Sequence, residues 1–152
     1  MSETLFWSLA PDILRLHRQS SYALLATGSQ IHDATLVNLD GLYYMWLEHA
    51  DDTLNQPQPG ILLIEDQEER ARISWIATAR TVHRKDSVYR RAANALRRRL
   101  KHNMENGQAY LVELSPQQGR LTIDNTQDFT ISPHDLMRAL YPANERMKSF
   151  AL

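Results

Sequence analysis

Short β-like segments joined by brief turns constrain the fold of this chain more than any other feature. The clearest hairpin signal is Asp40-Gly41, which separates a partly alternating run from the apolar run LYYMWL. Further turns are expected at Gln118-Gly119 and at Asn125. The segments do not alternate with helices, so they predict an antiparallel, closed sheet rather than a parallel, doubly wound one. Eight strands are expected, at residues 22–27, 34–39, 42–47, 61–65, 72–82, 110–114, 120–123 and 129–131.

Three helices are expected, at the start, the middle and the end of the chain. The first covers residues 5–18, with Ser8 as N-cap and Pro11 in its first turn. The second covers residues 87–104, and the last follows Ser132-Pro133. The predicted class is therefore mainly β with helices (α+β), in a single domain over residues 1–152. The second helix has an apolar face at Val88, Ala92, Leu96 and Leu100, with Met104 beside it.

The composition excludes several kinds of site. The chain has no cysteine, which rules out disulfides, thiolate-bound metals and thiol catalysis. It has only 5 glycines and none of the GxGxxG, P-loop or GxSxG motifs, which argues against a glycine-rich phosphate loop. No apolar run approaches the roughly 18 residues of a membrane span, and no secretory signal is visible. We therefore expect a cytoplasmic protein that does not bind membranes.

Charge is distributed unevenly along the chain. Residues 1–69 hold 11 acids and 2 bases, whereas residues 70–101 hold 11 bases and 1 acid. The near-neutral total of −1 argues against a dedicated nucleic-acid binder, so a nucleic-acid role ranks last among the predicted functions. The segregation indicates acidic and basic surfaces that meet across the fold or across a subunit interface. The run Arg97-Arg98-Arg99 is interpreted as a solvated helix face, with an anionic ligand or an acidic partner as the alternatives.

The 6 histidines are scattered and show no metal-ligand spacing. His17 and His83 are interpreted as ordinary polar residues on the faces of their elements. His49 and His134 are the better candidates for a metal or haem-iron ligand, because each lies at the end of an element. Next to His49, the pair Asp51-Asp52 is interpreted as part of a solvated polar turn, with acid–base machinery as the alternative.

Four stretches of the chain share a recognisable order and spacing. They are YALLAT with ATLVNLDGLYYMWLEHADDTLN, then QPQPGILLIED, RISWIATARTV and AYLVELSPQQGRLTI. Together they resemble the split-barrel flavin-binding proteins related to pyridoxamine 5'-phosphate oxidase, in particular the haem-utilisation branch, over about residues 22–131. The resemblance implies a six-stranded antiparallel split β-barrel of the FMN-binding type. It also implies a homodimer that holds FMN or haem in clefts at the dimer interface.

The resemblance also indicates which residues bind a cofactor. After the third strand, Thr53 and Asn55 keep the family's phosphate-holding pattern, and Arg70 and Arg72 are expected to add positive charge. The pair Asp51-Asp52 occupies positions where related proteins have basic or hydroxyl side chains. Carboxylates repel a phosphate, so we expect FMN to bind weakly because of this pair.

The predicted function is therefore that of a small-ligand-binding split barrel that holds haem or flavin between two copies. If the chain is an enzyme, the resemblance implies an oxidoreductase whose chemistry comes from the flavin or haem. The alternative is a barrel without a cofactor that acts through protein–protein contacts, and the acidic turn favours it.

Overall fold

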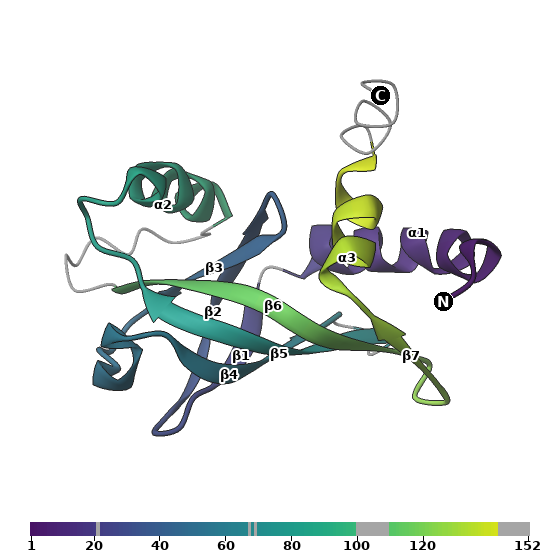
Figure 1. Ribbon diagram of the computed structural model, residues 1–152, viewed down its shortest axis with the longest axis horizontal. Coiled ribbons are helices and arrows are strands. Elements are labelled where there is room, and N and C mark those ends of the chain that lie inside the picture. The colour runs from purple at the N-terminus through teal and green to yellow at the C-terminus, as the bar shows by residue number, and fades with distance from the viewer. Residues whose placement is uncertain (21, 67, 69, 100–109, 143–152) are drawn as a thin grey trace.

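The chain forms a closed six-stranded antiparallel barrel with three helices and one extra strand, as seen in a computed structural model (Figure 1). The structure describes residues 1–20, 22–66, 68, 70–99 and 110–142. It confirms the α+β class and the antiparallel, closed sheet. The elements are α1 (Glu3–Gln19), β1 (Tyr22–Ala26), β2 (Ile31–Leu39), β3 (Leu42–Leu47), the 3₁₀ helix η1 (Asp52–Asn55), β4 (Gln58–Glu65), β5 (Ala71–Thr81), α2 (Ser87–Arg99), β6 (Tyr110–Ile123), β7 (Gln127–Ile131) and α3 (Pro133–Leu140).

The barrel closes because β3 pairs with both β2 and β6. Neighbouring strands follow the order β3-β2-β1-β4-β5-β6, and the β3–β6 ladder completes the ring. Strand β7 lies outside the ring and pairs with residues 119–123 of β6, beyond the part of β6 that pairs with β3. The β2–β3 turn is built on Asp40 and Gly41, whose φ angles of 54° and 93° lie in the left-handed region. The hairpin signal is thereby confirmed.

Strand β6 is one strand of 14 residues, where the sequence predicted two strands and a turn at Gln118-Gly119. That prediction is wrong because Gly119 has a packing role. A Cβ at this position would lie 2.6 Å from Cζ3 of Trp75 and 2.9 Å from Cγ1 of Ile131. Glycine therefore lets the buried Trp75 ring lie directly against the β6 backbone. The described residues accordingly form seven strands, not eight.

Helix α1 begins earlier than predicted, with Ser2 as its N-cap. The Ser2 hydroxyl oxygen accepts the Leu5 N–H at 3.1 Å, whereas Ser8 lies inside the helix and donates to the Leu5 carbonyl. Pro11 is therefore an interior residue of the helix, on its exposed side. Helix α3 begins where predicted, with a capping box at Ser132. No helix in the described part of the chain is long and apolar enough to cross a membrane.

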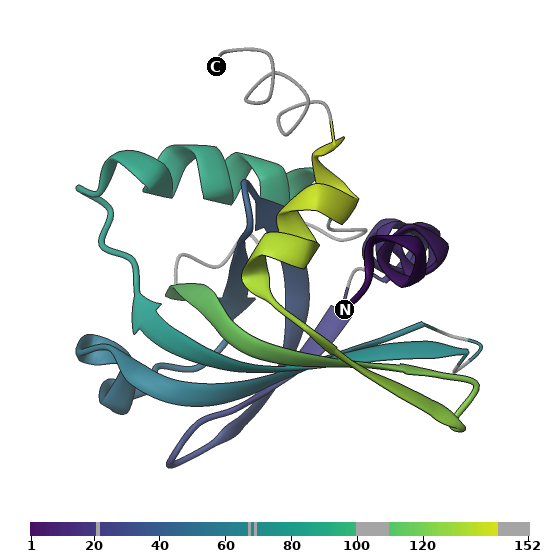
Figure 2. The ribbon, with the colours of Figure 1, turned by 45° about the vertical axis from the view of Figure 1, so that its right-hand side comes forward.

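The helices cover two sides of the barrel (Figure 2). Helices α1 and α3 pack on each other and on the barrel core through Phe6, Ile13 and Leu136. Helix α2 covers the outer face of β2, β3 and β6, where Ala92 and Leu96 contribute to a second apolar cluster. Both residues are buried, which confirms the predicted apolar face of the helix. The expected continuation of that face at Leu100 and Met104 lies outside the described residues.

Arg99 is an exception to the solvated basic face expected of α2. Its guanidinium is half-buried and donates to the carbonyls of His17 at 2.8 Å, Ser20 at 3.0 Å and Leu36 at 3.2 Å. Two of these carbonyls belong to the C-terminal end of α1, where a positive charge is favourable. Arg99 thus joins α2 to α1, while Arg97 and Arg98 are exposed as predicted.

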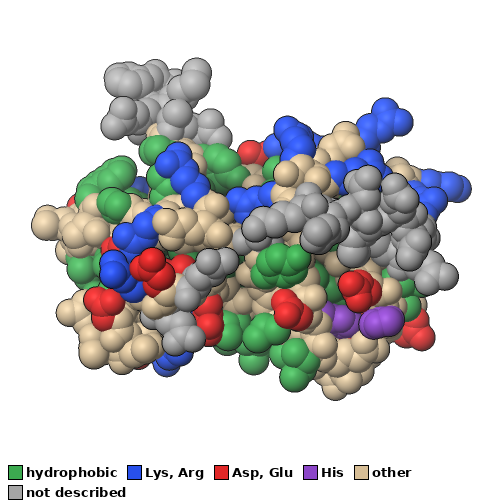
Figure 3. Space-filling model, turned by 180° about the vertical axis from the view of Figure 1, so that it is seen from behind, with side chains coloured by type: hydrophobic (Ala, Val, Ile, Leu, Met, Phe, Trp, Pro, Cys, Tyr) green, Lys and Arg blue, Asp and Glu red, His purple; other side chains and the backbone are tan. Residues whose placement is uncertain are grey.

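One outer face of the barrel remains apolar and exposed. The strand register aligns four side chains across β2, β1, β4 and β5, and we call this set the apolar row: Ile31, Ala26, Ile61 and Ile76. Ile31 is 77% exposed and Ile61 is 54% exposed. Tyr22 and Leu24 of β1 extend the exposed apolar surface. Figure 3 shows hydrophobic side chains gathered on the rear of the molecule beside acidic and histidine groups. A contiguous apolar surface of this kind typically marks an interaction site.

Candidate functional site

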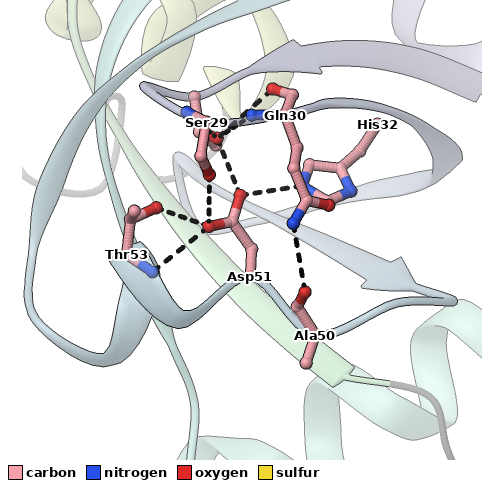
Figure 4. A network of polar contacts seen from close by, with 7 residues as sticks. Ser29, Gln30, His32, Ala50, Asp51 and Thr53 are labelled. Carbon is pink, nitrogen blue, oxygen red and sulfur yellow. Dashed lines mark hydrogen bonds and ion pairs between the residues drawn. The ribbon is translucent and has the colours of Figure 1, made fainter.

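The segment between β3 and β4, where the sequence places the cofactor site, folds around a buried carboxylate (Figure 4). Asp51 is only 5% exposed and caps η1 by accepting the Thr53 N–H at 3.2 Å. Leu54, also in η1, is fully buried in the barrel core. These two contacts fix η1 at one end of the barrel.

Four side chains donate hydrogen bonds to Asp51. Its Oδ2 accepts the Thr27 hydroxyl at 2.7 Å and the Nε2–H of His32 at 3.0 Å. Its Oδ1 accepts the hydroxyls of Ser29 at 3.0 Å and of Thr53 at 2.5 Å. Because a carboxylate can only accept, His32 carries its proton on Nε2. Burial raises the pKa of Asp51, but the hydrogen bonds from His32, Thr53, Thr27 and Ser29 outweigh burial and hold this pKa well below its usual range.

The interpretation of this run as a solvated polar turn is therefore wrong for Asp51, although Asp52 is exposed. Asp51 faces inward and does not present its charge to a ligand in solvent. The β1–β2 hairpin supplies three of its side-chain donors, and they lie about 20 residues upstream. The sequence did not reveal these three donors, because the β1–β2 pairing is what brings them close to Asp51. One signal was present: His32 has the same inward parity on β2 as Ala34 and Leu36.

Thr53 and Asn55, the residues predicted to hold a phosphate, both lie in η1 and are exposed. The Thr53 hydroxyl donates its only proton to Asp51. Its outward lone pairs can only accept, and a phosphate oxygen is itself an acceptor. Thr53 is thus poorly suited to the phosphate-holding role that the resemblance implies.

Arg70 and Arg72 lie at the opposite end of the β4–β5 hairpin from η1. Gln58 pairs with Ala79 near η1, whereas Arg72 pairs with Glu65 seven residues further along β4. At about 3.3 Å per residue, the two ends are about 23 Å apart. Arg70 also forms an exposed ion pair with Glu68 at 3.2 Å. A ligand of flavin or haem size bound to one protomer therefore cannot contact both η1 and these arginines.

The two candidate iron ligands are also separated. His49 is exposed on the segment that leads into η1. Its neighbour Ala50 accepts a hydrogen bond from the Gln30 amide at 3.3 Å, and Gln30 directly precedes Ile31 of the apolar row. His134 is exposed in the first turn of α3, across the molecule from η1 (Figure 1). The described residues contain no cluster of three or more side chains able to hold a metal ion.

Two shallow hollows lie on the exposed outer face. One has a volume of about 210 Å³ and the other about 200 Å³. Sites for drug-sized ligands commonly have volumes of about 300–1,000 Å³, so neither hollow alone encloses a cofactor. The first is lined by Tyr22, Ala23, Leu24, Asp33, Leu63 and Glu65, and the second by Ser74, Ile76, Gln118, Gly119, Arg120 and Thr130.

Several solved structures have a similar fold. A haem-binding protein from Mycobacterium smegmatis superposes with a TM-score of 0.66 at 14% identity, over 84% of this chain and 59% of that one. HutZ from Vibrio cholerae, described as a haem storage protein, superposes with a TM-score of 0.62 at 20% identity, over 76% of this chain and 94% of that one. The third is a Clostridium acetobutylicum protein of the pyridoxinephosphate oxidase family, related to general stress protein 26 of B. subtilis. It superposes with a TM-score of 0.63 at 12% identity, over 85% of this chain and 97% of that one. These likenesses confirm the predicted split-barrel fold. No family model matches the chain, and no curated protein matches it.

Proposed function

We propose that two copies of this chain bind a planar cofactor between the outer faces of their barrels, and that haem is preferred over flavin. The apolar row carries this proposal, because it is exposed in one copy and lies beside two hollows that are each too small for a cofactor. A second copy related by a two-fold axis presents the same row and supplies the missing wall. The haem-binding proteins among the structural neighbours support this choice of ligand.

The side chains available also favour haem over FMN. Haem needs apolar walls, a cation for each propionate and an iron ligand. The apolar row supplies walls. His49 of one copy, whose neighbour Ala50 bonds to Gln30 next to Ile31, is the first candidate iron ligand, and Arg70, Arg72 and Arg120 of the other copy are exposed cations. His134 is the second candidate. FMN needs donors for its phosphate, and the hydroxyls near η1 already donate to Asp51. If the protein is an oxidoreductase, the bound cofactor supplies that chemistry, and these residues orient it.

Titration with haemin tests the proposal, followed by the Soret absorption band, with FMN titrated in parallel by fluorescence quenching. We expect the Soret band to shift and saturate at a fixed ratio of haem to chain, and FMN to bind at least about tenfold more weakly. His49→Ala is expected to move the band, His134→Ala tests the second candidate in the same way, and the exposed His83→Ala is the matched control. The absence of a saturable Soret shift would contradict haem binding.

The second candidate is a cofactor-free barrel that uses the same apolar face for protein–protein contacts. The small volume of the hollows and the internal use of the η1 hydroxyls favour it. A purified dimer that takes up neither haemin nor FMN would support this candidate over the first.

A further inference from the structure

We propose that the end of the barrel next to η1 contains an oxyanion-binding cradle, and that the chain's own Asp51 carboxylate occupies it. The cradle consists of four side chains, which are Thr27 and Ser29 of the β1–β2 turn, His32 of β2 and Thr53 of η1 (Figure 4). In the native chain, Asp51 therefore excludes any external carboxylate or phosphate from these donors.

The donors of the β1–β2 turn are held in place without help from Asp51. The Thr27 hydroxyl oxygen accepts the N–H groups of Ser29 at 3.3 Å and Gln30 at 3.1 Å. The Thr27 N–H in turn donates to the Gln30 carbonyl at 2.9 Å. The Thr27 hydroxyl has two acceptors within reach, Asp51 Oδ2 at 2.7 Å and the Gln30 carbonyl at 3.2 Å, and its single proton is donated to the nearer carboxylate. His32 is fixed by the β1–β2 ladder, where it pairs with Leu25. Shortening Asp51 should leave these donors in place.

The cradle suits a negative charge in both number and type of donor. It presents three hydroxyls and an imidazole N–H, and the Thr53 N–H adds a further bond. Hydrogen bonds to an ionised acceptor are roughly twice as strong as neutral ones. The depressed pKa of Asp51 agrees with this, because it shows that the same donors stabilise the charged form despite burial.

The position of the cradle defines the class of anion that it accepts. Ser29 and Thr53 are exposed, so the cradle lies close to the surface although Asp51 itself is only 5% exposed. Truncation to alanine removes one carboxylate and leaves room for a small oxyanion such as formate or acetate. Inorganic phosphate also has anionic oxygens that accept hydrogen bonds, but it is larger than formate or acetate. Asp51 is thus a specificity-determining residue that closes this end of the barrel to phosphate-bearing ligands.

Chemical rescue tests the proposal. Thermal unfolding of Asp51→Ala is measured against increasing formate, acetate or inorganic phosphate, with sodium chloride at matched ionic strength. We expect the variant to lose several degrees in melting temperature, and formate or acetate to restore it in a saturable manner while chloride does not. Recovery with phosphate as well would show that the cradle also accepts the larger anion.

Two variants serve as matched controls. Asp51→Asn removes the same charge but keeps the cradle filled with an isosteric amide, so it should be destabilised without recovery by any anion. Asp52→Ala removes an exposed carboxylate and should behave as the unmodified chain does. Equal responses of Asp51→Ala and Asp51→Asn, or a melting temperature of Asp51→Ala that no oxyanion restores, would overturn the proposal.

If Asp51→Ala is unfolded in anion-free buffer, the same titration is followed as recovery of the folded fraction by circular dichroism. A chain that stays unfolded at every formate and acetate concentration also counts against the cradle. The measurement involves no cofactor. Its failure is therefore distinguishable from a failure of haem binding, and the proposed function does not depend on it.

Discussion

His17 is a buried histidine whose hydrogen bonds fit only the neutral ring. Its Nδ1 lies 2.7 Å from the Ile13 carbonyl, so Nδ1 carries the proton. Its Nε2 lies 2.7 Å from the Tyr43 hydroxyl, which donates to it and accepts the Trp75 Nε1–H at 3.0 Å. Burial lowers the pKa of His17 to about 4, and the nearby Arg99 charge acts in the same direction. The interpretation of His17 as an ordinary polar residue of a helix face is therefore wrong.

The low pKa of His17 predicts a loss of stability in mild acid. Its ordinary pKa is about 6.5, so between pH 6.5 and 4 the unfolded chain binds a proton there and the folded chain does not. The stabilisation is complete above pH 6.5 and is lost as the pH falls toward 4. The expected loss is about 3 kcal/mol of unfolding free energy. Urea denaturation at pH 7 and at pH 4.5 measures it.

The matched controls for this prediction are His17→Gln and His83→Gln. The first should flatten the pH dependence between pH 6.5 and 4, whereas the exposed His83 should leave it unchanged. An identical pH profile for His17→Gln and the unmodified chain would show that another group causes the acid sensitivity.

Residues such as His17 and Asp51 mark the limit of sequence reasoning at this scale. The sequence correctly predicted that His49 and His134 lie near the ends of elements and that Asp52 is solvated. It did not predict the two buried polar networks, because each joins side chains from elements that only the closed barrel brings together. The burial of a polar residue depends on partners that are distant in the chain.

Among the elements, helix α2 offers the sharpest test of packing. Leu96 is fully buried between the helix and the outer face of the barrel. Leu96→Asp should cost several kcal/mol, because it places an unpaired charge in an apolar cluster. Thermal unfolding measures the loss, and Asn94→Asp on the exposed side of the same helix is the control. An unchanged melting temperature for Leu96→Asp would contradict the packing of this helix face against the barrel.

In strand β6 a single glycine makes room for a buried ring. Gly119→Ala places a Cβ within 2.7 Å of two atoms of the buried Trp75 ring. We expect a loss of about 1–3 kcal/mol, which is typical of overpacking in a core. Gly28→Ala is the control, because a Cβ there has no neighbour within 4 Å. Denaturant midpoints of the two variants should differ clearly, and equal midpoints would show that the Trp75 ring can move aside.

The sequence predicted the existence and type of most elements, because periodicity and turn residues act locally. The Asp40-Gly41 hairpin and the Ser132 cap show this, since each depends on neighbours within a few residues. The error at Gln118-Gly119 has the opposite origin, because this glycine packs against a ring on another strand. The error at Ser8 is local, because Ser2, three residues before Leu5, is the serine that accepts the Leu5 N–H.

For the whole molecule, the apolar row predicts the oligomeric state. Ile61→Glu places a charge on an exposed position of β4, so the barrel should remain folded while self-association weakens by at least about tenfold. Light scattering at micromolar concentration measures this. Trp7→Glu, at a residue that is 51% exposed on α1, is the control and should leave association unchanged. A mass of about 17.6 kDa for the unmodified chain would contradict the dimer itself.

The ladder that closes the barrel also bears on how the chain reaches its fold. It joins Tyr43 to Leu114 and Leu47 to Tyr110, whereas the β2–β3 and β4–β5 ladders are local hairpins. The chain between two distant strands loses conformational entropy before their pairing contributes any favourable free energy. We therefore expect the β3–β6 ladder to form late in folding. Met45→Ala, in the buried centre of this ladder, should then speed unfolding more than it slows folding, as measured by stopped-flow kinetics.

A φ-value near 1 for Met45→Ala would instead place closure of the barrel in the folding nucleus.

Late closure of the barrel has a consequence during synthesis of the chain. The ribosome adds more than sixty residues after β3 before β6 begins to emerge. Throughout that interval the outer edge of β3 has no strand to pair with, and an open edge is where nascent chains associate wrongly.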